Sequence, residues 1–124
     1  MLTALPGDEN ILNEFYLTTV AGNARTKVAE IGFFWNAAGT TVGYFNSGTA
    51  CSSYTDPTGR KWNCRYLLDG SAGKYIMFYS GGQVFNTTLY SKAMLASLVS
   101  KGLVSDALYV NRVAIGVEPV RGAG

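Results

Sequence analysis

The segment "KVAEIGFFWN", residues 27–36, predicts a strand, because its side chains alternate between the two faces of an extended chain. Ile31, Phe33 and Trp35 share the more apolar face, which we expect to pack in the core. Glu30 lies on the other face, in the middle of the predicted strand. A carboxylate among apolar neighbours costs free energy unless it is paired or used. The strand therefore makes Glu30 a candidate functional residue.

Several other segments carry a strand pattern and are separated by turn residues. We expect strands in "ILNEFYLTTV" (11–20), "TVGYF" (41–45), "KYIMFYS" (74–80), "QVF" (83–85) and "ALYVNRVAIGVEP" (107–119). One helix interrupts them, over about residues 88–101, with Asn86, Thr87 or Thr88 as its N-cap and Gly102 as its stop. The sequence thus predicts one mainly β domain over residues 1–124, a jelly-roll-like β-sandwich with a helix on one side.

The segment "CSSYTDPTGRKWNC", residues 51–64, predicts a hairpin. Asp56-Pro57-Thr58-Gly59 fits a type I turn, with Asp first, Pro second and Gly fourth. Strands that fold back around this turn place Cys51 opposite Cys64, within the distance that a disulfide requires. The alternative is a pair of unpaired buried thiols in a reducing cell.

Composition excludes several classes of function. Hydrophobic residues make up 48% of the chain, charged residues 15%, and the net charge is +2, which excludes a disordered chain and a strongly basic nucleic-acid binder. The sequence has no histidine and only two cysteines, so the usual nitrogen and sulfur ligands of a transition-metal site are missing. Catalysis by Ser-His-Asp or Cys-His groups is excluded for the same reason. Any catalysis must use carboxylates, lysines or tyrosines.

Targeting signals are also missing from the sequence. No apolar run approaches the roughly 18 residues of a membrane span. The first ten residues, "MLTALPGDEN", lack the basic start and apolar centre of a signal peptide.

Glu118 is the second candidate carboxylate, since it also lies in an apolar segment, near the end of the last predicted strand. Hydrolysis of a glycosidic bond requires two facing carboxyl groups, about 5 Å apart when the anomeric configuration is retained. Glu30 and Glu118 fit this requirement if their strands share one curved sheet. The alternative is that both are solvent-facing strand residues.

The order of four segments resembles the C-terminal half of glycoside hydrolase family 12, the jelly-roll endoglucanases and xyloglucanases. These segments are "VAEIGFFW", "GRKWN", "LYSKAMLASLVSKGL" and "YVNRVAIGVEPVRG", and the resemblance runs from about Leu12 to Gly122. It implies a retaining, endo-acting hydrolase of β-1,4-glycans that is extracellular, acts on β-glucan polysaccharide and needs no cofactor.

The resemblance also implies roles for individual residues. Glu30 takes the place of the nucleophile in a Glu-Ile-Met-Ile-Trp strand, and Glu118 that of the acid/base in a Gly-Thr-Glu-Pro-Phe segment. Asn13 stands where an aspartate supports the nucleophile. Three aromatic residues are the predicted substrate-binding positions: Trp62, Phe34 and Tyr66.

This chain also departs from the family pattern. The family domain has an N-terminal half that supplies further strands, and this sequence has no counterpart of them. An incomplete jelly roll leaves strand edges unpaired and invites association. The alternative function is therefore a non-catalytic module that assembles with another copy or chain, or binds polysaccharide through its tyrosines.

Overall fold

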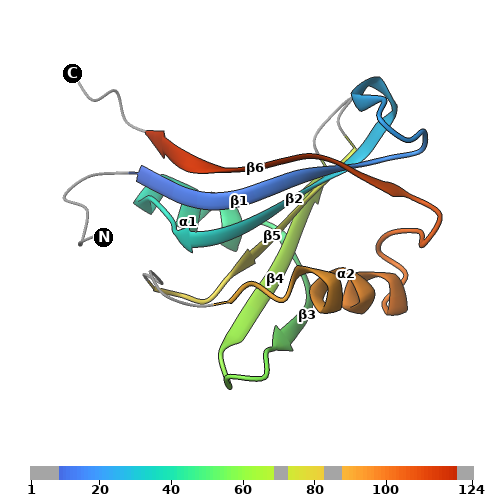
Figure 1. Ribbon diagram of the computed structural model, residues 1–124. Helices are drawn as coiled ribbons and strands as arrows, with labels where there is room; N and C mark the ends of the chain where they lie inside the picture. The colour runs from blue at the N-terminus through green and yellow to red at the C-terminus, as the bar shows by residue number, and fades with distance from the viewer. Residues whose placement is uncertain (1–8, 69–72, 83–87, 120–124) are drawn as a thin grey trace.

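A computed structural model describes residues 9–68, 73–82 and 88–119. The described strands form one six-stranded sheet in the order β3-β4-β5-β2-β1-β6 (Figure 1). The strands are β1 (Glu9–Thr18), β2 (Lys27–Asn36), β3 (Thr49–Thr55), β4 (Lys61–Leu68), β5 (Lys74–Tyr79) and β6 (Tyr109–Pro119). β2 and β5 run parallel, and every other neighbouring pair is antiparallel. The mainly β prediction is confirmed.

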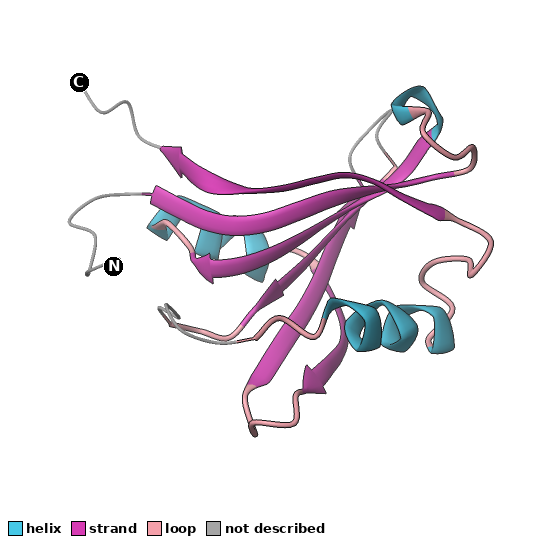
Figure 2. Cartoon of the chain, viewed as in Figure 1, coloured by secondary structure: helices cyan, strands magenta, loops and turns pink. Residues whose placement is uncertain are grey.

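Two α-helices lie on opposite faces of this sheet (Figure 2). The helix α2 (Ser91–Ser100) packs Met94 and Leu98 on one face, which we call the helix face. The helix α1 (Gly39–Asn46) packs Phe45 on the other. A short 3-10 helix, η1 (Ala24–Thr26), joins β1 to β2. Neither α-helix is long and apolar enough to span a membrane.

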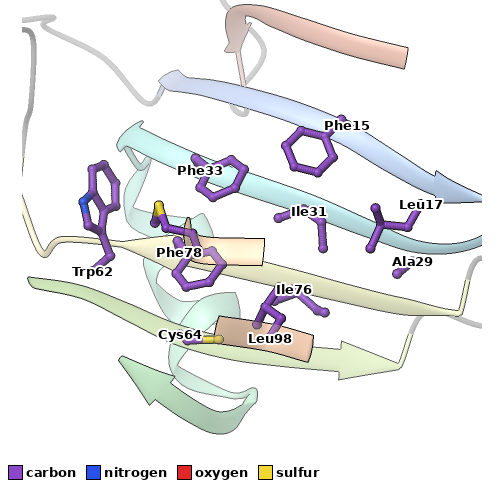
Figure 3. Close-up of a cluster of buried hydrophobic side chains, with 11 residues drawn as sticks. Phe15, Leu17, Ala29, Ile31, Phe33, Trp62, Cys64, Ile76, Phe78 and Leu98 are labelled. Carbon is purple, nitrogen blue, oxygen red and sulfur yellow. The ribbon is translucent and has the colours of Figure 1, made fainter. Parts of the chain in front are cut away.

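The larger core lies between the helix face and α2 (Figure 3). Phe33 is fully buried at its centre, with ring centroids 5.5 Å from Phe15 and 5.3 Å from Phe78. Ile31 from the same strand is also fully buried. The alternation of residues 27–36 therefore places Ile31 and Phe33 in the core as predicted, whereas Trp35 is half-buried and lies outside this cluster.

The predicted hairpin and disulfide are both confirmed. Cys51 and Cys64 pair across β3 and β4 and form a disulfide with a Cα–Cα distance of 4.9 Å. At the turn, the buried Asp56 carboxylate accepts hydrogen bonds from the Thr58 hydroxyl, from Trp62 Nε1 and from the backbone N–H of Arg60 and Thr58. Burial tends to raise the pKa of Asp56, but these hydrogen bonds outweigh it and the pKa is lowered.

The predicted helix is present as α2, with a later start and the predicted stop. Gly102 adopts a positive φ of 74°, and its N–H donates to the carbonyl of Val99 while that of Leu103 donates to Leu98. This is the Schellman arrangement that glycine favours. The helix begins after Tyr90 with no side-chain cap, so Thr88 is not its N-cap. The other two predicted caps, at positions 86 and 87, lie outside the described residues.

The helix α1 corrects the expected strand at residues 41–45. Its sequence has poor helix formers, two glycines and three β-branched residues, which is why propensity did not predict it. Packing decides the structure instead, because Phe45 contacts the buried side chains of Leu12, Phe34 and Met77. The expected strand at residues 83–85 lies outside the described residues.

The edge strand β6 carries an exposed apolar surface. Val113, Ile115 and Val117 have exposed fractions of 70%, 68% and 56%. Ile115 pairs with Asn13 and Val117 with Ile11, so this row lies on the helix-face side of the sheet. We call these three residues the β6 apolar row. In the described part of the chain, no element covers it.

Candidate active site

Three glutamates project from the sheet face opposite α2, one from each of three neighbouring strands. Glu30 comes from β2, Glu14 from β1 and Glu118 from β6. All three alternate with residues of the helix face, as Glu30 does with Ile31 and Phe33. We call this side of the sheet the carboxylate face.

Strand register sets the spacing of these side chains. Glu14 pairs with Gly32, so it is a diagonal neighbour of Glu30, at a typical Cβ–Cβ distance of about 7 Å. Glu30 itself lies opposite Tyr16, whereas Glu118 lies opposite Asn10, six residues further along β1. Six residues of a strand span roughly 20 Å. Glu14 therefore lies between Glu30 and Glu118, the two carboxylates that the sequence analysis predicted to act together.

Glu14 is the carboxyl group most altered by its surroundings. Burial, followed by the negative charges of Glu30 and Glu118, raises its pKa to about 6, against a smaller lowering by Lys27. Glu14 thus keeps its proton in mildly acidic solution, where an ordinary glutamate is ionised. Sequence reasoning missed Glu14; the signal that reveals it is its alternation with Phe15, which is a core residue.

Glu30 makes a charged contact on its own strand. Lys27 Nζ lies 2.8 Å from Glu30 Oε1, and the same ammonium group lies 4.3 Å from the ring centroid of Tyr16. The Glu30 side chain keeps 18% of its surface exposed. The carboxylate is therefore paired but still accessible.

Glu118 is held by a buried amide. Asn10 Nδ2 donates to Glu118 Oε1 at 2.9 Å, and Asn10 Oδ1 accepts from the backbone N–H of Ala38 at 2.9 Å. Because Asn10 is only 2% exposed, this connection to the start of α1 fixes the amide orientation. Asn10 is a second site residue that the sequence did not indicate.

The predicted supporting role of Asn13 does not fit the structure. Asn13 pairs with Phe33 and its Oδ1 accepts a hydrogen bond from Trp35 Nε1, both on the helix face. Because neighbouring strand residues point to opposite faces, Asn13 points away from Glu30 and Glu14 points toward it.

Two of the three aromatic residues predicted to bind substrate, Trp62 and Phe34, are buried, and the role of Tyr66 stays a prediction. Trp62 is fully buried on the helix face and donates through Nε1 to Asp56 Oδ2 at 3.2 Å, so its ring has no surface for a sugar. Tyr66 packs against the same core, with Lys74 Nζ 5.6 Å from its ring centroid. Phe34 does lie on the carboxylate face but is only 2% exposed, within the cluster around Phe45.

The assembled groups suit acid and base chemistry more than metal binding. Among the described residues, no cluster of three or more Asp, Glu or Cys side chains is arranged to hold a metal ion. The carboxylate face instead gathers three carboxyl groups, and the pKa of one of them, Glu14, is raised to about 6. Glycoside hydrolysis uses paired carboxyl groups, one of which donates a proton.

Comparisons with known proteins bear on the fold. No protein-family model and no curated protein matches this sequence. Solved structures do match. A family 12 xyloglucanase from Bacillus licheniformis superposes with a TM-score of 0.76 and 18% identity, over 94% of this chain and 51% of that chain. An endoglucanase from Rhodothermus marinus gives 0.75 and 20%, over 95% and 51%. The family 12 endoglucanase 3 of Trichoderma harzianum gives 0.75 and 19%, over 94% and 51%.

This chain has the fold of half a family 12 glycoside hydrolase. The predicted resemblance to that family's jelly roll, with a helix packed on one side, is confirmed at the level of the fold. The chain spans about half the length of the structures it matches. The family fold thus provides a scaffold in which the three glutamates share one face.

Proposed function

We propose that the carboxylate face is the active site of an endo-acting β-1,4-glycan hydrolase of the cellulase or xyloglucanase type. The observation that carries the proposal is the gathering of Glu14, Glu30 and Glu118 on one face of a family 12 fold. The negative charge there disfavours an anionic ligand and is compatible with a neutral sugar.

The proposed mechanism is a retaining double displacement. Glu30 attacks the anomeric carbon while the bond to the leaving oxygen breaks and Glu118 gives that oxygen its proton. Glu118 then removes a proton from water, which attacks the same carbon and releases Glu30. Retention needs carboxyl groups about 5 Å apart. The register of Glu30 and Glu118 along β1 does not favour that spacing, which weighs toward Glu14 as the partner of Glu30.

Glu14 is the alternative acid in this mechanism. It is the diagonal neighbour of Glu30, and its raised pKa leaves it protonated in mildly acidic solution. A general acid needs a proton to donate at the working pH. The structure thus offers two candidates for one role, Glu118 by family resemblance and Glu14 by position and pKa.

The substrate class is tested by incubating the protein with soluble β-1,4-glucan, xyloglucan and mixed-linkage glucan. Endo-action predicts that solution viscosity falls before many reducing ends appear, since cleavage inside a chain shortens it most. A reducing-sugar signal without early loss of viscosity would contradict endo-action. The disulfide between Cys51 and Cys64 fits the extracellular location that we propose, because such bonds persist in oxidising compartments.

A second candidate function rests on the β6 apolar row. Three exposed β-branched side chains on an edge strand are an association surface, and the matched structures have about twice the length of this chain. We propose, as the alternative to catalysis, a module whose sheet is completed by strands of another copy or chain. It predicts that the parent sediments above 13.3 kDa and that Val113→Lys with Ile115→Lys restores the monomer.

Leu68→Lys is the matched control for this test, because Leu68 is 78% exposed at the end of β4, away from β6. We expect it to leave the sedimentation of the parent unchanged. A parent chain that is monomeric at high concentration would remove the assembly module.

A further inference from the structure

Tyr75 reaches across the carboxylate face in a space that Gly32 leaves free. It lies on β5 beside Glu30 of β2, its partner in the parallel register. A Cβ atom added to Gly32 would lie 2.8 Å from the Tyr75 hydroxyl oxygen and 3.0 Å from Cε2 of Phe34. The hydroxyl thus occupies the position that a side chain at residue 32 would fill.

This position puts the hydroxyl among the three glutamates. Gly32 pairs with Glu14 on its other side, so the Tyr75 oxygen lies over the strand between Glu14 and Glu30. Burial, followed by the charges of Glu14, Glu30 and Glu118, raises the pKa of Tyr75 far above its ordinary value. The phenol therefore stays protonated and remains a hydrogen-bond donor at every working pH.

The donor is also uncommitted. Within the described ranges, no protein group accepts a hydrogen bond from the Tyr75 hydroxyl. A half-buried polar group without a protein partner loses free energy unless water or a ligand satisfies it. The surrounding carboxylates accept hydrogen bonds, and Tyr75 supplies a neutral donor beside them, which together match a polyhydroxylated ligand.

We propose that Tyr75 is a substrate-positioning residue, whose hydroxyl donates a hydrogen bond to the sugar unit bound over Glu30 and Gly32. The inference rests on the proposed glycan hydrolase function and adds a contact to its site. Gly32 leaves the space that the Tyr75 hydroxyl occupies, since any larger residue at position 32 would displace this hydroxyl. The pair therefore fixes where a sugar oxygen can lie relative to Glu30.

The experiment compares Tyr75→Phe, Gly32→Ala and the double variant, using hydrolysis of soluble β-1,4-glucan and calorimetric binding of cellotetraose. Tyr75→Phe deletes the oxygen and Gly32→Ala displaces it, so each should lower kcat/KM and binding about tenfold. In the double variant the Cβ of Gly32→Ala has no Tyr75 hydroxyl to displace, because Tyr75→Phe has already removed it. We therefore expect the two losses not to add.

Tyr54→Phe is the matched control, because it makes the same chemical change on β3, in a side chain that packs against the helix-face core. It should leave hydrolysis and binding unchanged. Thermal unfolding provides the second readout: Tyr75→Phe should retain the parent's Tm, since the hydroxyl has no protein partner to lose. A loss of activity that follows a loss of Tm would overturn the positioning role.

The outcomes separate this proposal from the proposed function. An active parent with an equally active Tyr75→Phe variant overturns the role of Tyr75 and leaves the hydrolase intact. A folded parent that binds cellotetraose without cleaving it, more weakly after Tyr75→Phe, supports the contact and removes catalysis. A folded parent that neither binds nor cleaves overturns both.

Discussion

The two faces of the sheet differ in what they bury. The helix face packs aromatic and aliphatic side chains of four strands against α2, with Phe33, Trp62, Ile76 and Phe78 fully buried. The carboxylate face has a smaller apolar cluster, around Phe45, and places three glutamates beside it. Repulsion between neighbouring negative charges lowers the free energy of unfolding. Packing on the helix face must offset this loss on the carboxylate face.

Strand alternation produces this division from neighbouring residues. Asn13 and Glu14 are adjacent in the chain, yet one bonds Trp35 on the helix face and the other lies beside Glu30 on the carboxylate face. A shift of one residue in register would exchange these roles. Substitutions on each face can therefore be tested separately.

Phe33→Ala should be the most destabilising change. Phe33 is fully buried between Phe15 and Phe78, and truncating a phenylalanine in such a core typically costs about 3–5 kcal/mol in the free energy of unfolding. Phe45→Ala, in the smaller cluster of the carboxylate face, should cost less than about 3 kcal/mol. Urea unfolding measures both losses, and equal losses would contradict a larger contribution of the helix-face core to stability.

Removing the disulfide should have the next largest effect. The bond between Cys51 and Cys64 closes a loop with a sequence separation of 13, which the loop-entropy model values at about 3 kcal/mol. Urea unfolding of the Cys51→Ser, Cys64→Ser double variant measures this loss. Because β3 is the edge strand farthest from β6, hydrolysis per folded molecule should match that of the parent. Lost activity in a folded double variant would mean that the carboxylate face depends on this edge.

Glu14→Gln should have the smallest effect on stability, visible in its pH dependence. The folded pKa of Glu14 is about 6 against an ordinary value of 4.5, so the native state binds this proton more tightly than the unfolded chain. The stability of the parent therefore falls as pH rises from about 4.5 to about 6. The side chain is partly exposed, so solvent screening limits the change to less than about 1 kcal/mol.

Thermal unfolding between pH 4 and pH 7 tests the Glu14 prediction. The Tm of Glu14→Gln should decline less than that of the parent across this window. Asp106→Asn, which removes an exposed carboxyl group before β6, is the control and should follow the parent. Asp56 does not interfere, because its pKa is lowered and its contribution is lost only in more acidic solution. Parallel curves for the parent and Glu14→Gln would contradict a raised pKa.

The sequence predicts the elements whose cause is local. The turn at residues 56–59 forms the predicted hairpin, and Cys51 pairs with Cys64 beyond a register shift that separates this pair from that of Tyr54 and Trp62. Gly102 ends α2 because it adopts a positive φ that other residues avoid. The alternation of residues 27–36 assigns Glu30 and Phe33 to opposite faces.

What the sequence did not predict depends on contacts between distant segments. The helix α1 forms against its own propensities because Phe45 packs on the sheet. Trp62 was assigned to substrate by resemblance, but its strand position turns it into the core. The link between Asn10 and Glu118 joins residues 108 positions apart, and only the pairing of β1 with β6 reveals it.

The proposal that the carboxylate face cleaves β-glycans is tested by the release of reducing sugar from soluble β-1,4-glucan, xyloglucan and mixed-linkage glucan by the parent, Glu30→Gln, Glu118→Gln and Glu14→Gln. We expect an active parent and a loss of roughly 1,000-fold or more in Glu30→Gln, with a comparable loss in whichever of Glu118 and Glu14 is the acid. A folded but inactive parent, or a Glu30→Gln variant as active as the parent, would contradict the claim.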